Sequence, residues 1–482
     1  MLTSSPFNAL FTFGKTDQTT AVVPDIELRA LDLISNFYVI CPRLMRKEEE
    51  EHKRILYYFP DVETPKRKAE ITGMGAGVIG FTNELLNLEK TNNSKQRRRH
   101  RFIWSTKTAS IVLPVESDFI IGVTFNREIC DSKQYYPHCG TLLKMMENIY
   151  ETYKLFYGPF KLEFEKETKT KELELTLNIF FSNYLPTIKL STVPLIDYLD
   201  GIGFMPLKPK LFLEVQCFIE QATEECPQIR QLMFLYQSRL VQHSIEKTAL
   251  KTLFRFIIEY MIPHASSKEL QPEFAKSTES GSFVEASFDF TSQAGPYPKV
   301  KLMNEETGEF ETYHLIIYYH LNATLCMIMN ENSNPAPALT RLHPFLQIKM
   351  SELGTTIGEM LTDVNRPIAA GTPFHFIYYN YDSLSFRTSL KVVAQPGHIE
   401  TIKFTKETNR AIYNSFDKFI EKTDENAYLD LQVQGDLWIG FKRANQRILV
   451  IFLSNAAVTN IESMRSAVKS IIDSTFDHIL LE

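Results

Sequence analysis

The sequence is poor in cysteine, and this shortage excludes a small scaffold held together by disulfide bonds or by structural zinc. Its cysteines are scattered over 482 residues without any C-x-x-C pair. Cys130 and Cys139, with the adjacent His138, make at most half of a metal site, because no second Cys/His pair stands at zinc-finger spacing. We therefore expect no metal, and free, buried thiols in a reducing compartment. The six cysteines are Cys41, Cys130, Cys139, Cys217, Cys226 and Cys326.

The sequence also lacks long apolar runs. No stretch reaches the roughly 18 consecutive apolar residues of a membrane-spanning helix. The first twenty residues lack the basic start and apolar run that mark a secretory leader. We expect a cytoplasmic protein whose contact with membranes is peripheral. The sequons at Asn92 and Asn322 then carry no sugar.

Motifs of ordinary catalysis are missing as well. The sequence contains no G-x-S-x-G, H-E-x-x-H or G-x-x-x-x-G-K-[ST] motif. Its histidines have no matched serine, aspartate or cysteine partner close in the sequence, although a spatial triad stays open. An enzyme with its own nucleophile or general acid is disfavoured. A net charge of -6 also argues against a protein whose whole surface binds nucleic acid, because such binding needs a positive surface.

What is present indicates a folded protein of several domains. Hydrophobic residues make up 44% of the chain and charged residues 23%, as in ordinary globular proteins. At 482 residues the chain exceeds the size at which a single core stops growing, so two to four domains are expected. The aromatic share of 12% favours strands and large apolar contacts.

One pattern occurs three times along the chain. "FYVICPRL" from Phe37, "LMFLYQSRL" from Leu232 and "FHFIYYNYDSL" from Phe374 are apolar strands that end in Tyr or Cys just before a turn. After the first copy the periodicity predicts a second strand, a helix, three strands and two helices. That order indicates an α+β fold with an antiparallel sheet between helices. We predict three related modules in series.

The predicted boundaries follow from the repeats and from shifts in composition. Residues 1–30 are Ser/Thr-rich and predict a flexible extension. The first module is predicted over residues 31–207, the second over 208–365 and the third over 366–482. Within the second, residues 263–298 are rich in Ser, Glu, Gly and Pro and predict a flexible insertion.

The stretch "GMGAGVIG" has the glycine spacing of a dinucleotide-binding loop at Gly75, Gly77 and Gly80. Such a loop needs its glycines at the end of a strand, but here the preceding strand ends near Pro60. We predict a helix instead. Its apolar stripe consists of Ile71, Met74, Val78, Phe81 and Leu85, and its small-residue strip of Gly73, Ala76, Gly77 and Gly80. The strip lets another backbone approach closely; a frayed helix without a partner is the alternative.

A basic tract, "KQRRRHR", follows this helix in a predicted loop. Clustered cations bind anionic lipid or serve as a nuclear import signal, and a solvated loop is the plain alternative. A second tract, "PKRK" at 65–68, lies on the same side if both are loops, which favours membrane contact. The candidate lipid ligands are Lys95, Arg97, Arg98, Arg99 and Arg101.

A set of segments in order along the chain resembles one known family. They are "FYVICPRL", "KRILYYFP", "YKLFYGPF" from Tyr153, "FFSNYL" from Phe180, "FMPL" from Phe204, "LEVQCFI" from Leu213, "LHPFLQIK" from Leu342 and the ending "STFDHILLE". Together they are similar to the Ccz family of vacuolar fusion proteins. The resemblance runs from about residue 33 to the last residue. The extension at residues 1–30 and the arginine-rich loop depart from the family's pattern.

The resemblance implies a fold and an activity. Family members consist of three longin domains, which agrees with the three predicted modules. They pair with a Mon-family subunit, through the first longin domain of each, as a guanine nucleotide exchange factor for the late-endosomal Rab GTPase. The complex is recruited to phosphoinositide membranes of endosomes and lysosomes, and animals add a regulatory third subunit. No catalytic side chain and no cofactor are implied.

The resemblance also implies candidate contact residues in the first module. For the GTPase they are Leu56, Tyr58 and Pro60. For the Mon-family partner they are Gly73, Met74, Gly77, Val78 and Phe81. Ordinary core packing is the alternative for the larger side chains among them. Two other functions stay open: a triple-longin subunit of an exchange factor for Rabs of lysosome-related organelles, and a non-catalytic trafficking scaffold.

Overall fold

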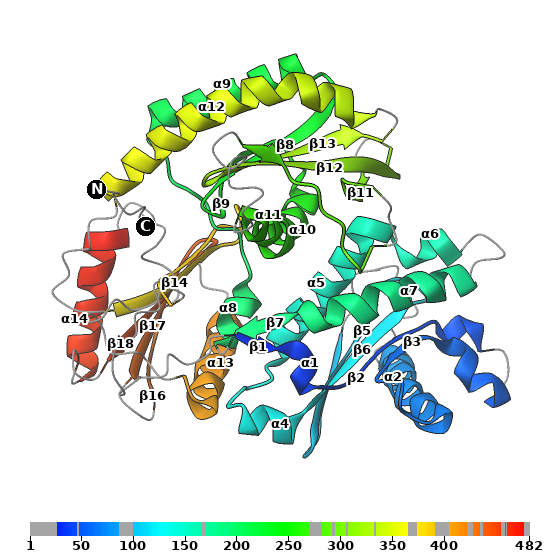
Figure 1. Cartoon of the computed structure of the whole chain (residues 1–482). Helices are drawn as coiled ribbons and strands as arrows, with labels where there is room; N and C mark the ends of the chain where they lie inside the picture. Colours follow the sequence, from blue (N-terminus) through cyan, green and yellow to red (C-terminus); the bar gives the residue numbers. More distant parts are fainter. Residues whose placement is uncertain are drawn as a thin grey trace, which may run out of the picture.

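The structure is a computed structural model (Figure 1). It describes residues 27–45, 48–85, 100–164, 170–191, 193–269, 281–291, 295–304, 307–331, 334–364, 374–390, 404–421, 428–433, 437–454, 458 and 460–476. The main secondary structure forms three antiparallel sheets with helices on their faces. We call each sheet with its covering helices a module.

The first module has five strands in the order β3-β2-β6-β5-β4. These are β2 (Ile34–Ile40), β3 (Ile55–Phe59), β4 (Arg101–Trp104), β5 (Thr108–Pro114) and β6 (Ile120–Asn126). Short 3-10 turns at Pro42–Leu44 and Glu48–Arg54 join β2 to β3. Successive buried side chains of β2 point alternately into two hydrophobic cores, one on each face of the sheet. Both faces of this sheet are therefore covered.

Helix α2 (Pro65–Leu85) covers one face of the first sheet, and α5 (Cys139–Tyr157) and α7 (Thr170–Tyr184) cover the other (Figure 1). Helix α5 begins where His138 accepts a hydrogen bond from the backbone N–H of Thr141. The short helices α4 (Arg127–Ser132) and α6 (Phe160–Phe164) flank it.

The second module repeats this order with β9-β8-β13-β12, and both β10 and β11 pair with β12. The strands are β8 (Ile229–Tyr236), β9 (Arg239–His243), β10 (Ser282–Phe283), β11 (Lys299–Met303), β12 (Phe310–His320) and β13 (Ala323–Asn330). Helices α9 (Pro209–Glu225) and α12 (Pro335–Val364) cover one face. Helix α10 (Lys247–Phe256) covers the other and continues through a π-helical turn into α11 (Ile262–Glu269).

The third module has the order β15-β14-β18-β17-β16. Its strands are β14 (Phe374–Asn380), β15 (Phe386–Thr388), β16 (Tyr428–Val433), β17 (Leu437–Ala444) and β18 (Arg447–Ser454). Helix α13 (Lys406–Glu421) lies on one face, and α14 (Ile461–Ile471) with its π-helical end at Ile472–Phe476 lies on the other.

All three sheets therefore share one topology: the second and first strands of each module are followed by the last and the next-to-last, and the third strand lies at the far edge. The second module has one additional strand, β11, at that edge. In each, the connection between the second and third strands contains a helix, namely α2, α10 or α13. The predicted α+β fold of three modules, each an antiparallel sheet between helices, is confirmed.

Two predicted flexible segments contain ordered parts. Three residues of the extension form β1 (Glu27–Arg29), which pairs with β7 (Lys189–Ser191) and leads into α1 (Ala30–Leu33). The insertion begins as α11, and its residues 281–291 bury Val284 and Phe290. Residues 1–26, 270–280 and 292–294 lie outside the described part. Composition hid this packing because the apolar side chains are spaced among Ser, Glu and Asp.

A connector after the first module lies among all three (Figure 1). It contains β7 and α8 (Pro194–Leu199), whose apolar side chains pack against the third module. Ile202 then exchanges backbone hydrogen bonds with Leu384 and Phe386, and Met205 donates to Leu240 of β9. The connector thus bonds to the edge strands of both the second and the third sheet.

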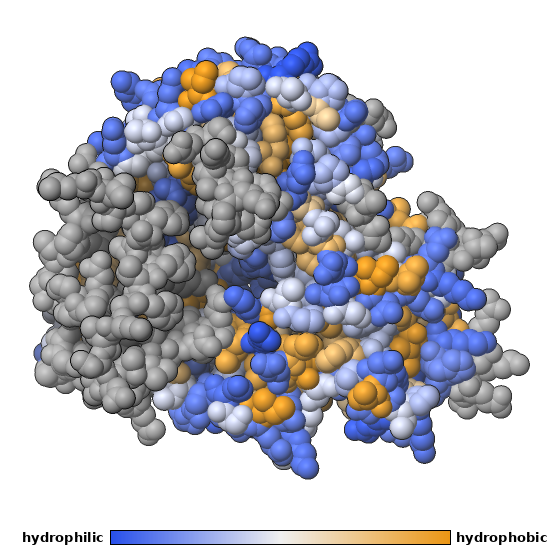
Figure 2. Space-filling model, in the orientation of Figure 1, coloured by the Kyte–Doolittle hydropathy of each residue, from blue (hydrophilic) through white to orange (hydrophobic). Residues whose placement is uncertain are grey.

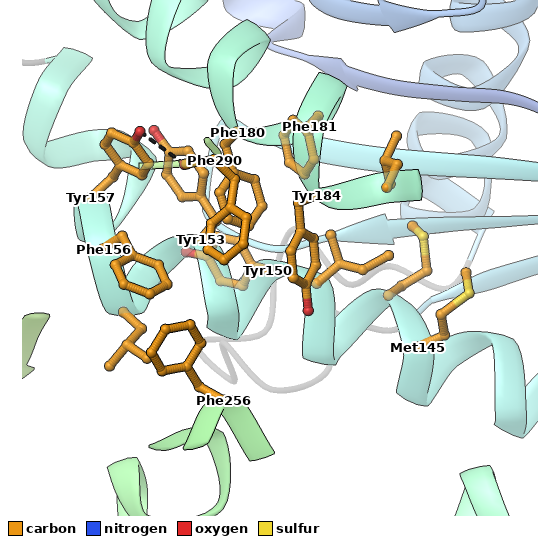
Figure 3. Packing of buried hydrophobic residues seen from close by; sticks show 14 of the residues in the cluster. Met145, Tyr150, Tyr153, Phe156, Tyr157, Phe180, Phe181, Tyr184, Phe256 and Phe290 are labelled. Atoms are coloured by element: carbon orange, nitrogen blue, oxygen red, sulfur yellow. Dashed lines mark hydrogen bonds between the residues drawn. The ribbon is translucent and has the colours of Figure 1, made fainter. Parts of the chain in front are cut away.

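The cores of the first and second modules are continuous. Rings from α5, α7, α10 and residues 281–291 form one aromatic cluster (Figure 3). Phe290 lies among these rings, with centroid distances of 5.6 Å to Tyr184 and 5.7 Å to Phe156. The Tyr157 hydroxyl donates to the carbonyl of Phe290. The two modules therefore share a single buried interior.

The cysteines are free, as predicted, but not all of them are buried. Cys217 is exposed on α9 and Cys139 is half-buried, so the prediction of six buried thiols was wrong at these positions. In the described part of the chain, no three His, Cys, Asp or Glu side chains gather as metal ligands. Nor is any helix among the described residues long and apolar enough to cross a bilayer.

Candidate functional site

Helix α2 packs on the first sheet through small side chains. Its buried positions are Ala69, Thr72, Gly75 and Ile79, spaced three or four residues apart along one face. A Cβ on Gly75 would lie only 2.1 Å from the hydroxyl oxygen of Tyr38 on β2. Gly75 therefore leaves room for the tyrosine, and the close approach occurs toward the sheet of the same module.

A buried arginine fastens the beginning of α2. The Arg54 guanidinium donates to the carbonyl oxygen of Ala69 at 2.7 Å, and the carboxylate of Glu51 lies 3.9 Å away. A Cβ on Gly73 would lie 2.6 Å from this guanidinium, so Gly73 also makes room for a side chain of its own module. These contacts fix one side of α2 and leave its other side uncovered.

The outer face of α2, defined by Met74, Gly77, Phe81 and Leu85, is exposed and apolar. Met74 is 52% exposed, Phe81 65% and Leu85 67%. A Cβ on Gly77 or Gly80 would meet no atom within 4 Å. Core packing is thus excluded for Met74 and Phe81, whereas Val78 is half-buried. Figure 2 shows apolar side chains among the polar ones on the surface over this helix.

The predicted small-residue strip of Gly73, Ala76, Gly77 and Gly80 divides between two sides of α2. Gly73 makes room for Arg54 of its own module, and Gly75 for Tyr38, whereas an approach of another backbone at Gly77 and Gly80 stays a prediction. Gly77 and Gly80 instead leave open space between the larger side chains of the outer face. Helical periodicity located the helix but could not decide which face meets the sheet, because the small residues pack there and the large ones do not.

The GTPase-contact candidates on β3 are mostly covered. Leu56 is buried in the core beneath α7 and Tyr58 beneath α2, so neither presents a contact surface. Burial raises the pKa of Tyr58 to about 12. Pro60, just after the strand, is half-buried and accessible. Two of the three candidates are therefore corrected to core residues.

The loop after Pro60 is the exposed neighbour of α2, and sequence reasoning missed it. Val62 is 91% exposed, and Lys68 on α2 donates to the carboxylate of the adjacent Asp61 at 2.7 Å. Hydrogen bonding and attraction from Lys68 lower the pKa of Asp61. The only signal for Val62 was an apolar residue in a turn, where nothing requires one. Val62 and the outer face of α2 together form the candidate interface.

The basic candidates divide into two groups. Lys95, Arg97, Arg98 and Arg99 lie outside the described residues. Arg101 lies on β4, where its guanidinium donates to Thr82 Oγ1 at 2.5 Å and to Asn83 Oδ1 at 2.9 Å. Arg101 therefore fastens the end of α2 to the sheet, which corrects its assignment as a lipid ligand.

Comparison with known proteins matches both of the first two modules. The model described as "First Longin domain of INTU, CCZ1 and HPS4" matches residues 34–158, and "Intu longin-like domain 2" matches residues 229–349. A protein of Nematostella vectensis named "Vacuolar fusion protein CCZ1 homolog" is 25% identical over 92% of this chain and 97% of its own length. Over almost its whole length the chain therefore resembles the Ccz family of vacuolar fusion proteins.

Other members of this family align over similar lengths. The homolog of Xenopus tropicalis is 21% identical over 92% of this chain and 96% of its own. That of Dictyostelium discoideum is 20% identical over 87% and 92%. In this chain the first longin match contains β2 to β6, α2 and all of α5. The candidate interface thus lies on a longin domain.

Proposed function

We propose that this chain is one subunit of a heterodimeric guanine nucleotide exchange factor. With a Mon-family partner it promotes GDP release from the late-endosomal Rab GTPase during endosome maturation and fusion with the lysosome or vacuole. The observation that carries the proposal is the exposed apolar outer face of α2 on a longin domain of a chain that resembles the Ccz family. A face of this kind marks a protein contact on a folded protein.

The mechanism requires no reacting side chain. The GTPase's own loops hold the nucleotide and Mg²⁺, so a partner that binds the opened switch conformation more tightly lowers the barrier to release. Each 1.36 kcal/mol of that preference is tenfold in rate. We propose that Val62 and Pro60 contact the GTPase and that the outer face of α2 contacts the Mon-family subunit. Recruitment to phosphoinositide membranes belongs to the same proposal, as does a regulatory third subunit in animals.

The test is nucleotide release by the reconstituted complex. The chain is purified with its Mon-family partner, and loss of a fluorescent GDP analogue is followed from several Rabs. Selective acceleration for the late-endosomal Rab is the expected result. Stimulation only of Rabs from lysosome-related organelles would favour an exchange factor for those organelles. A folded complex that stimulates no Rab would favour a non-catalytic trafficking scaffold.

A matched pair of variants tests the interface. Phe81→Ser on α2 and Leu213→Ser on α9 each remove a large side chain of similar exposure, 65% and 61%. We expect F81S to weaken co-purification with the partner at least tenfold, because exposed anchors on an apolar face contribute most to association. L213S is expected to leave it unchanged. Equal effects of both variants would contradict the assignment of α2.

A further inference from the structure

One carboxylate lies where the three modules meet. Asp200 ends α8, and its side chain is only 18% exposed. Its Oδ2 atom accepts a hydrogen bond from Asn148 Nδ2 at 2.7 Å. Two cations reach the same oxygen, Lys251 Nζ at 2.9 Å and Arg255 at 3.4 Å. Donors therefore converge on Asp200 from two directions.

These donors come from different modules. Asn148 lies on α5 of the first module, and Lys251 and Arg255 lie one turn apart on α10 of the second. The next residues of the connector bind the third module: Ile202 donates to the Leu384 carbonyl at 2.7 Å. Three consecutive residues, 200–202, thus join all three modules, and α8 lies between these modules in Figure 1.

The backbone beside Asp200 leaves little space for movement. A Cβ on Gly201 would lie 2.7 Å from the Leu384 carbonyl oxygen and 2.6 Å from Phe386 Cβ. Glycine at this position lets the connector press against β15 of the third sheet. Asp200 is held by charge on one side of this contact, and the main chain is held by hydrogen bonds on the other.

The cations depend on Asp200 for compensation. Burial opposes the charge of this carboxyl, but Arg255 and Lys251, with the hydrogen bonds from Lys251 and Asn148, outweigh it and lower its pKa. Besides Asp200, the carboxylate of Glu259 lies 3.5 Å from Arg255. Removing the charge of Asp200 leaves Lys251 largely buried next to a neutral side chain, which is costly in a low-dielectric site.

We propose that Asp200 is a conformational lock that holds the three modules in one fixed arrangement. When its charge is lost, the connector loosens and the third module changes its orientation relative to the first two, which share one core. The lock involves no GTPase or partner subunit, so it can be tested separately from the proposed exchange activity.

The test is hydrogen exchange of the full chain with Asp200→Asn, which keeps the shape and removes the charge. We expect at least tenfold faster exchange at the amides of Ile202 and Phe386, which bond across modules, and unchanged exchange inside β6. Lys299→Met is the control, because it breaks an exposed pair with Glu331 within the second module. Unchanged rates at Ile202 and Phe386 in D200N would overturn the lock, as would equal acceleration in K299M.

A second variant covers the case in which D200N fails to fold. Lys251→Met leaves Asp200 with Arg255 and Asn148, so a smaller acceleration at the same two amides is expected. If K251M leaves both amides at wild-type rates, the proposal fails. Small-angle scattering of either variant gives the matching global measurement, with a larger radius of gyration expected than for the wild type.

Discussion

Phe290 gives the sharpest prediction about how the first two modules hold together. It belongs to the predicted flexible insertion, yet it is only 4% exposed and lies among rings of α5, α7 and α10 (Figure 3). Replacing it with alanine removes a buried ring and leaves a cavity between modules. Truncation of a buried phenylalanine typically costs about 3–5 kcal/mol, which is a large share of a total stability of about 5–15 kcal/mol.

The backbone contacts of this segment survive the substitution. Tyr157 donates to the carbonyl of Phe290 at 3.1 Å, and Asn183 donates to the carbonyl of Asp289 at 3.0 Å. Neither bond involves the phenylalanine side chain, so the measured loss reports the ring. We expect F290A to lower the free energy of unfolding, measured by urea titration followed by circular dichroism, by about 3–5 kcal/mol.

Phe288 supplies the matched control. It is half-buried, and its ring lies 5.3 Å from Phe256 and 5.4 Å from Phe290. Burying only part of a ring contributes about 1–2 kcal/mol, so F288A should lose about that much. If F290A lost no more than F288A, the inserted segment would not be part of the shared core, and the reasoning would be refuted.

Three further predictions concern single groups. Gly75→Ala should destabilise the chain by about 1–3 kcal/mol through its clash with Tyr38, whereas Gly77→Ala should stabilise it by up to about 1 kcal/mol; a urea titration of both variants with equal results would contradict the packing of α2. Labelling of the native protein with a thiol reagent at pH 8 should modify Cys217 first, because the other cysteines are buried or half-buried, and mass spectrometry of the peptides would show any other order. The stability difference between wild type and D200N should be constant from about pH 5 to 8 and should shrink as the pH falls below about 4, because the pKa of Asp200 is lowered in the folded state and the charged form is lost there only at still lower pH; a difference that grew on acidification would contradict this.

The repeated strand order was within reach of sequence reasoning because each module starts with the same kind of apolar strand. The helix at α2 was also predictable from its period. The orientation of that helix was not, since it depends on Tyr38, which lies 37 residues before Gly75 in the chain and fills the space that the glycine leaves. Large apolar side chains normally face the sheet, and here they face outward.

The connections between modules left no local signal. Asp200, Asn148, Lys251 and Arg255 are about 50 residues apart or more across their contacts, and each has an ordinary neighbourhood in the sequence. The insertion was predicted from its Ser and Glu content, although Phe290, in its described part, is buried. Composition indicates only the average burial of a segment. Whether a single ring at a contact between modules is buried depends on the residues that pack against it.

The shared aromatic interior also sets an order of events during synthesis. The Tyr157 hydroxyl binds the carbonyl of Phe290, which leaves the ribosome 133 residues later. At roughly 5–20 residues per second, that interval is about 7 to 27 seconds. During that time the first module has its five strands and α5 and α7, but the rings of Phe156 and Phe180 lack their cover. The nascent chain therefore exposes an aromatic surface until the second module arrives to close it.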